Sequence, residues 1–89
     1  MKTAFKKSFA KDLKKYSKNK KLLNLIKNTI QEVEDADGIT SIKNLKKLKS
    51  EGFYYRIRIG NYRMGLIIEK ETATFVRALH RSEIYRYFP

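Results

Sequence analysis

Cations alternate with apolar side chains in residues 54–63, which read YYRIRIGNYR. Alternation of period two is typical of a half-buried strand, because successive side chains point to opposite faces of a sheet. Gly60 and Asn61, between the two runs, predict a two-residue hairpin turn. We therefore expect a hairpin that gathers its cations on one face, where they would bind negative charge.

The position of this turn fixes which residues lie opposite each other. Arg58 would face Arg63, and Arg56 would face Gly65. Tyr54 and the arginines then share one face of the hairpin. Like charges directly opposite each other destabilise a sheet, so a chain that keeps them is expected to bind something strongly anionic there. A basic face that is merely solvated is the competing interpretation.

A second group of polar side chains follows the last predicted strand. His80, Arg81 and Tyr85 lie within the sequence HRSEIYRYF. In an antiparallel meander the third strand ends beside the start of the second, so we expect this corner to approach Arg58 and Arg63. His80 is a candidate acid or base, because histidine titrates near neutral pH without any perturbation. A surface histidine at the end of a strand is the competing interpretation.

The bulk composition limits the class of protein. The chain has 89 residues, enough for one domain over 1–89, and a formal net charge of +12 at pH 7. This charge predicts a polyanionic partner, with strong salt dependence if that partner is nucleic acid. A hydrophobic content of 42% argues against a wholly disordered basic tail. The sequence has no cysteine, membrane-length apolar run or signal-peptide pattern, so we expect a cytoplasmic protein without disulfides.

The expected fold class is α+β, with two N-terminal antiparallel helices packed on a small antiparallel β-sheet and a short C-terminal helix or tail. Apolar stripes predict one helix from Ser8, as its N-cap, to about Tyr16. A second helix is predicted from Lys20 to Asp35, and Gly38 ends it.

Strand patterns dominate the second half of the chain. Period-two patterns predict three strands of a meander: Phe53–Ile59, Tyr62–Glu69 and Ala73–Leu79. A weaker strand signal covers Lys2–Phe5, and Ser82–Phe88 is expected as the C-terminal helix or tail. We interpret the lysine-rich segment Ile39–Glu51 as a connection whose apolar residues contact the core.

The sequence YRIRIGNYR followed by HRSEIYRYF resembles the RelE/ParE superfamily of bacterial toxins from type II toxin–antitoxin systems, and its RelE-like branch in particular. The resemblance covers nearly the whole chain. It includes the cations on the first hairpin strand, the arginine on the next strand, and Arg81 with Tyr85 near the end. The resemblance implies a toxin that cuts mRNA in the ribosomal A site, without a cofactor, and that is silenced by an acidic RelB-like antitoxin.

RNA cleavage without a metal suits these residue types. Attack of the 2′-hydroxyl on the adjacent phosphate needs a proton acceptor, cations for the phosphorane and a proton donor for the 5′-oxygen. The candidate catalytic residues are Arg56, Arg58, Arg63, His80, Arg81 and Tyr85. Where some relatives carry lysines this chain has Arg56 and Arg58, and arginine does not serve as a base. His80 and Arg81 compete for one role, and Tyr85 either transfers a proton or stacks on a base.

Further residues are candidates for binding RNA: Tyr54, Lys11, Lys14, Lys15, Lys46 and Lys47. Lysines contact phosphates without reading sequence, and the lysines near the N-terminus would dock on ribosomal RNA. Their competing interpretation is a solvated helix face, and Tyr54 either stacks on a base or packs on the protein. No metal-ligand spacing is present, so the carboxylates between Glu32 and Asp37 are expected to be structural.

Two other functions fit parts of this pattern. ParE-like members of the superfamily share the expected fold but act on DNA gyrase, and they generally lack the full set of arginines. A non-catalytic basic domain that binds RNA or a ribosome would explain the charge alone. The arginines together with Tyr85 favour RNA cleavage over action on gyrase, whereas arginine in place of lysine at positions 56 and 58 keeps the non-catalytic domain open as an alternative.

Overall fold

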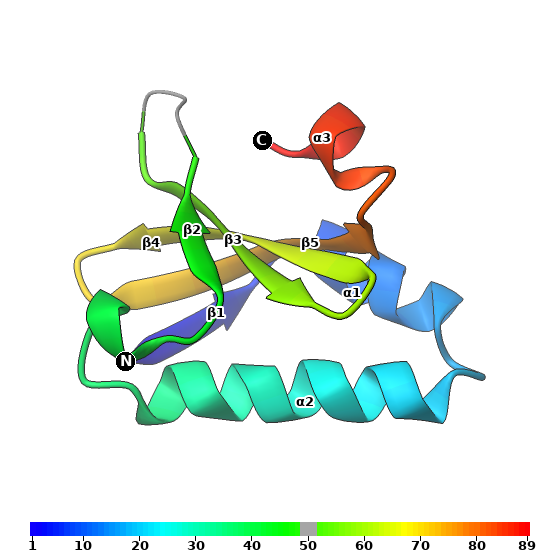
Figure 1. Cartoon of the computed structure of the whole chain (residues 1–89), viewed down its shortest axis with the longest axis horizontal. Helices are drawn as coiled ribbons and strands as arrows, with labels where there is room; N and C mark the ends of the chain where they lie inside the picture. The colour runs from blue at the N-terminus through cyan, green and yellow to red at the C-terminus, as the bar shows by residue number, and fades with distance from the viewer. Residues whose placement is uncertain (49–51) are drawn as a thin grey trace.

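A mixed β-sheet with helices on both faces organises the computed structural model, which describes residues 1–48 and 52–89 (Figure 1). In these residues the strand order is β1-β5-β4-β3-β2. The elements, in chain order, are β1 (Lys2–Phe5), α1 (Lys7–Lys15), α2 (Lys20–Asp35), the 3₁₀ turn η1 (Ile39–Ser41), β2 (Leu45–Lys47), β3 (Tyr54–Ile59), β4 (Tyr62–Glu69), β5 (Thr72–His80) and α3 (Ile84–Tyr87). The α+β prediction is confirmed.

The two faces of the sheet are covered differently. The inner face packs under α1 and α2, whereas the short α3 is the one helix on the outer face in the part of the chain that the structure describes (Figure 1). On β3, Tyr55, Ile57 and Ile59 are buried on the inner face. Arg56 and Arg58 alternate with them and point to the outer face. No helix in the described residues is long and apolar enough to span a membrane.

The predicted hairpin has the predicted register. Arg58 pairs with Arg63, and Arg56 pairs with Gly65. Gly60 has a φ of +61°, a left-handed conformation that glycine adopts without steric cost. The turn chemistry and the period-two pattern therefore sufficed to place the arginines on one face.

The first strand makes the sheet mixed, not wholly antiparallel as expected. The weak strand signal at Lys2–Phe5 is confirmed, and β1 pairs in parallel with β5, with Phe5 opposite Phe75. α1 and α2 follow β1 and cover the inner face before the chain returns to the sheet.

The interpretation of Ile39–Glu51 as a connection is wrong in its middle part. Leu45–Lys47 forms β2, which pairs antiparallel with β3 at the edge of the sheet. A strand of three residues, two of them lysines, has too few positions to show a period of two, and it forms by pairing with β3. Residues 49–51 of the predicted connection lie outside the described residues.

The predicted helices are present, but the first begins differently. Its N-cap is Lys6, and Ser8 lies inside α1, where its hydroxyl donates to the carbonyl oxygen of Val76 at 2.6 Å. The prediction of Ser8 as N-cap is therefore wrong, because its hydroxyl bonds a strand instead of the helix. α2 begins as predicted, with the side chain of Asn19 accepting from the amide of Leu22.

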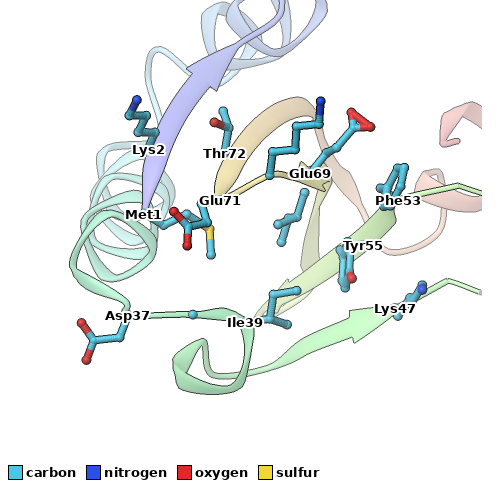
Figure 2. Close-up of a pocket in the computed structure, with 13 residues that line it drawn as sticks. Met1, Lys2, Asp37, Ile39, Lys47, Phe53, Tyr55, Glu69, Glu71 and Thr72 are labelled. Carbon is cyan, nitrogen blue, oxygen red and sulfur yellow. The ribbon is translucent and has the colours of Figure 1, made fainter.

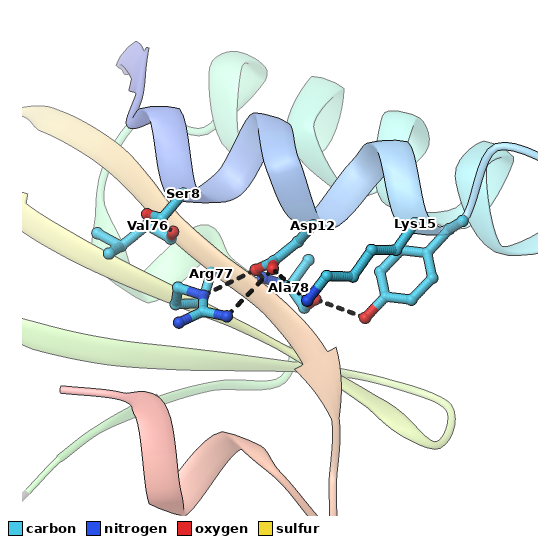
Figure 3. A network of polar contacts seen from close by, with 7 residues as sticks. Ser8, Asp12, Lys15, Val76, Arg77 and Ala78 are labelled. Atoms are coloured by element: carbon cyan, nitrogen blue, oxygen red, sulfur yellow. Dashed lines mark hydrogen bonds and ion pairs between the residues drawn. The ribbon is translucent and has the colours of Figure 1, made fainter.

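Asp12, which the sequence did not single out, joins α1 to β5 (Figure 3). Its carboxylate is 1% exposed and accepts from Arg77 Nε at 2.9 Å, Arg77 Nη2 at 3.1 Å and the Ala78 amide at 2.9 Å. Four residues on, the Tyr16 hydroxyl donates to the Ala78 carbonyl at 2.8 Å. Ser8, Asp12 and Tyr16 are spaced by four residues, so they lie on the same side of α1 and its C-cap. All three form hydrogen bonds with the backbone of β5 just after its pairing with β1 ends. We call this set the α1 zipper.

We predict that Asp12→Ala destabilises the chain by about 3 kcal/mol, because it leaves a partly buried guanidinium and a buried amide without their acceptor. Urea unfolding followed by circular dichroism measures the change. Glu32→Ala, which removes one exposed carboxylate from α2, is the matched control and is expected to change stability by less than about 0.5 kcal/mol. Equal changes in the two variants would contradict the role of the α1 zipper.

We also predict a loss of stability at high pH that depends on Tyr16. Burial, with the negative charge of Asp12, raises the pKa of Tyr16 from 10.0 to about 12. The unfolded chain therefore ionises this tyrosine at lower pH than the folded chain does. Its contribution is fully present below about pH 10 and is lost as the pH rises through about 12. Between these values wild type should lose stability more steeply than Tyr16→Phe, and parallel losses would refute this.

Candidate functional site

The arginines of the hairpin line a groove on the outer face. Its volume is about 360 Å³, and its lining residues are Asn44, Leu45, Lys46, Arg56, Arg58 and Arg63. We call this the arginine groove. Arg63 is held at the hairpin turn, because its Nη1 donates to the carbonyl oxygens of Gly60 and Tyr62, both at 2.9 Å. Among the described residues its Nε and Nη2 have no hydrogen-bond acceptor, so both can bind a ligand.

Electrostatic repulsion shapes this groove. Burial lowers the pKa of Arg63, and neighbouring positive charges lower it further. Those charges belong to Arg56, Arg58 and Arg81. Within the described residues no ion pair joins these arginines to a carboxylate. Arginine stays charged at physiological pH, so a bound anion would be stabilised by several cations at once.

Arg81 follows the end of β5, next to the hairpin turn, and is not among the residues that line the groove. Its amide donates to the carbonyl oxygen of Asn61 at 2.8 Å, which holds the segment after β5 against the hairpin turn. The side chain is exposed, and its charge acts on Arg63. The structure therefore places the backbone of Arg81 at the hairpin turn, as the meander predicts, and from there its charge acts on Arg63.

Tyr85, on α3, contacts one arginine of the groove, Arg56. Its ring centroid lies 4.7 Å from Arg56 Cζ, a cation–π distance. The tyrosine is 74% exposed, so its ring and hydroxyl are accessible from solution. Its neighbours Ile84 and Phe88 are buried against Leu79 and hold α3 on the sheet. Tyr85 and the arginines thus come from separate parts of the chain but meet at one surface.

Gly65 makes room for this arrangement. A Cβ atom at position 65 would lie 2.6 Å from ring carbons of Phe88, closer than side chains approach. The Phe88 ring therefore rests directly on the backbone of β4, opposite Arg56. Phe88 directly follows α3, so this contact limits how far α3, and Tyr85 on it, can lie from the sheet.

His80 does not join the arginines. It pairs with Tyr62 across the two strands, and the two rings lie edge to face with their centroids 5.3 Å apart. Tyr62 in turn packs on Tyr16, so both rings lie on the inner face with the helices. The expected approach of His80 to Arg63 is not met.

A β-bulge explains the direction of His80. Gly65 pairs with Arg77 and Leu66 pairs with Phe75, so Val76 is an extra residue in β5. Strict alternation from Phe75 would put residue 80 on the outer face, and one inserted residue reverses this. The same bulge turns Arg77 outward. No pattern in the sequence signals it.

The predicted RNA-binding residues lie in different places. Lys46 lines the arginine groove, which also includes Asn44, a residue the sequence analysis missed. Tyr54 packs edge-on against Phe88, at 5.7 Å between ring centroids. The remaining lysines lie away from the groove: Lys11, Lys14 and Lys15 are exposed on α1, and Lys47 alternates with Lys46 on β2.

Lys47 borders a second cavity, of about 580 Å³, below the inner side of β3 (Figure 2). Carboxylates from Asp37, Glu69 and Glu71 surround it together with lysines. Its charge is mixed, so it is less suited to phosphate than the arginine groove. Among the described residues no group of three or more histidine, aspartate or glutamate side chains is placed to hold a metal ion.

Comparison with known proteins identifies the family. Residues 4–85 match the model of the family described as the ParE toxin of the type II toxin–antitoxin system, parDE. The whole chain is 42% identical over 90 residues to Toxin RelE3 of Methanocaldococcus jannaschii, and the match covers 100% of both chains. The chain belongs to the RelE/ParE superfamily of toxins from type II toxin–antitoxin systems. The resemblance stated from the two sequence motifs, including the RelE-like branch, is confirmed.

Solved structures agree with this membership. The fold is similar to a chain of the RelB–RelE antitoxin–toxin complex from Methanococcus jannaschii, with 37% identity, a TM-score of 0.65 and coverage of 97% of this chain and 99% of that chain. It also resembles a chain of the DinJ–YafQ complex of E. coli, with a TM-score of 0.76, 15% identity and coverage of 93% and 96%. At this lower identity the likeness shows the fold alone.

We predict that Gly65→Ala detaches α3 from the sheet, because the added methyl group displaces Phe88. The overpacking should cost about 1–3 kcal/mol and speed amide exchange in residues 84–88. Hydrogen exchange measured residue by residue checks this. Gly38→Ala is the control, since its φ of −171° suits any residue and a Cβ there meets nothing within 4 Å. Unchanged protection of α3 in Gly65→Ala would contradict the prediction.

Proposed function

We propose that this toxin cleaves mRNA on the ribosome, in the A site, by attack of a 2′-hydroxyl on the adjacent phosphate. The observation that supports this most is the arginine groove, whose cations form no ion pair within residues 1–48 and 52–89 and lie beside an exposed tyrosine. Preorganised cations stabilise the charge that develops on a phosphorane. A solvated basic face would not need Gly65 and Phe88 to hold a tyrosine over an arginine.

The reaction forms a bond between the 2′-oxygen and phosphorus and breaks the bond between phosphorus and the 5′-oxygen. The 2′-hydroxyl gives up its proton to a side chain or to water, and the departing 5′-oxygen takes up a proton. The products are a 2′,3′-cyclic phosphate and a 5′-hydroxyl. Arg58 and Arg63, opposite each other in the hairpin, would contact the two non-bridging oxygens of the phosphate. Arg81 would stabilise the same charge, and Arg56 would hold a flanking phosphate. These cations let the step proceed without a metal ion.

Proton transfer is the harder half of this chemistry. Arginine does not give up its proton, so Arg56 and Arg58 are unsuited as bases. His80 faces the inner side of the sheet. Tyr85 is therefore the side chain over the groove that either transfers a proton or stacks on a base. Because Tyr85 would be the one candidate for proton transfer, acid–base catalysis by the toxin alone would be weak. The ribosome would compensate by holding the RNA in a reactive geometry.

An acidic antitoxin is the proposed partner. A related chain was solved in a RelB–RelE antitoxin–toxin complex. Here the formal net charge is +12, and the arginines of the groove repel each other. Carboxylates of a partner that cover the groove would relieve this repulsion and block RNA at the same time.

We predict that induction of the chain in bacteria produces cuts inside translated codons, seen by mapping mRNA 5′ ends within minutes. Arg63→Ala should lower cleavage about 100-fold or more, since it removes a cation from the developing charge. Lys21→Ala removes one positive charge from the exposed surface of α2 and is expected to cut like wild type. Tyr85→Phe keeps the ring but not the hydroxyl, so its activity separates stacking from proton transfer.

Other outcomes identify the alternatives. Growth arrest with intact mRNA and broken DNA would replace this proposal with a ParE-like action on DNA gyrase. The absence of both arrest and cleavage by folded chain would leave a basic domain that binds RNA or the ribosome. Cleavage by Arg63→Ala at the wild-type rate would contradict the assignment of the groove.

A further inference from the structure

A row of three residues on the outer face carries the three aromatic side chains at the C-terminal end. Gly65 on β4 pairs with Arg56 on β3 and with Arg77 on β5. The contacts over this row are Tyr85 on Arg56, Phe88 on Gly65 and Tyr87 on Arg77. The C-terminal segment therefore contacts the sheet at three neighbouring positions.

The two arginines of this row are held differently. Arg77 donates two hydrogen bonds to Asp12, which is almost fully buried and belongs to the α1 zipper (Figure 3). Such bidentate pairing fixes the plane of the guanidinium. Arg56 makes no ion pair with a carboxylate in the described residues, so it is free to bind a ligand. Arg77 is thus a fixed support, whereas Arg56 is part of the groove.

Tyr87 connects α3 to Arg77 through a cation–π contact. Its ring centroid lies 5.5 Å from Arg77 Cζ. α3 has only four residues, too few to be stable without contacts to the sheet. Tyr85 and Tyr87 are two residues apart, so their side chains leave the helix in directions about 200° apart. Fixing the Tyr87 ring on one side of α3 therefore fixes the Tyr85 ring on the other.

We propose that Arg77 is a positioning residue for the site. Held by Asp12, it binds the Tyr87 ring and so sets the rotation of α3 that places Tyr85 over Arg56. This inference rests on the proposed function, because the benefit of a fixed Tyr85 is a higher rate of RNA cleavage. This arrangement depends on the bulge at Val76, because the bulge turns Arg77 to the outer face.

The test compares Tyr87→Leu with Tyr87→Phe in the full chain. Leucine keeps an apolar side chain but removes the aromatic face, whereas phenylalanine keeps that face. The first readout is the NMR shift of the Arg56 side-chain protons, which the Tyr85 ring current moves upfield. We expect Tyr87→Leu to lose this displacement and Tyr87→Phe to retain it.

The second readout is cleavage of mRNA on purified ribosomes. Tyr87→Leu should lower kcat about 10-fold at unchanged KM, and Tyr87→Phe should cleave like wild type. Unfolding midpoints are recorded for both variants. An unchanged Arg56 shift in folded Tyr87→Leu, or a wild-type kcat, would overturn the proposal. If wild type itself cuts no mRNA, the proposed function fails, and the Arg56 shift alone decides whether the contact between Tyr87 and Arg77 positions Tyr85.

Discussion

Repulsion among like charges is the constraint on which the outer face of this protein depends. Arg58 and Arg63 lie directly opposite each other, and Arg56 and Arg81 add their charges to the same surface. Such an arrangement costs stability in the free chain, and an anion that binds there removes the cost. The same repulsion that opposes folding therefore favours binding of an anionic partner at this surface.

The rest of the fold offsets this cost on the other side of the sheet. α1 and α2 bury the inner residues of the hairpin, and the α1 zipper satisfies the polar edge of β5 where β1 ends. Asp12 also fixes Arg77, so one buried carboxylate supports both the packing of α1 and the surface that carries α3. The inner core and the candidate site are thus joined through β5.

The hairpin and its arginine cluster could be predicted, because the turn at Gly60 and Asn61 determines which residues of the two strands lie opposite each other, and the period of two determines which face of the sheet they share. The helices could be predicted from their apolar stripes. Other features depend on contacts that no local pattern records. β2 is too short to show a period, and the bulge at Val76 reverses the direction of His80. In the sequence Asp12 is one more polar residue on a basic helix. Its role arises because the pairing of β1 with β5 ends at Phe75, so the buried amide of Ala78 donates to the Asp12 carboxylate instead of to a strand.

In the proposed reaction, the arginine groove promotes attack of an RNA 2′-hydroxyl on the adjacent phosphate. The most direct measurement uses purified ribosomes carrying an mRNA with one 2′-deoxy nucleotide at the mapped cut in the A site. Our account predicts that this one change abolishes the cut, while the matched all-ribose mRNA yields a 2′,3′-cyclic phosphate end. Cleavage of the 2′-deoxy mRNA at the same bond would contradict the account, because the nucleophile would then be a group other than the 2′-hydroxyl.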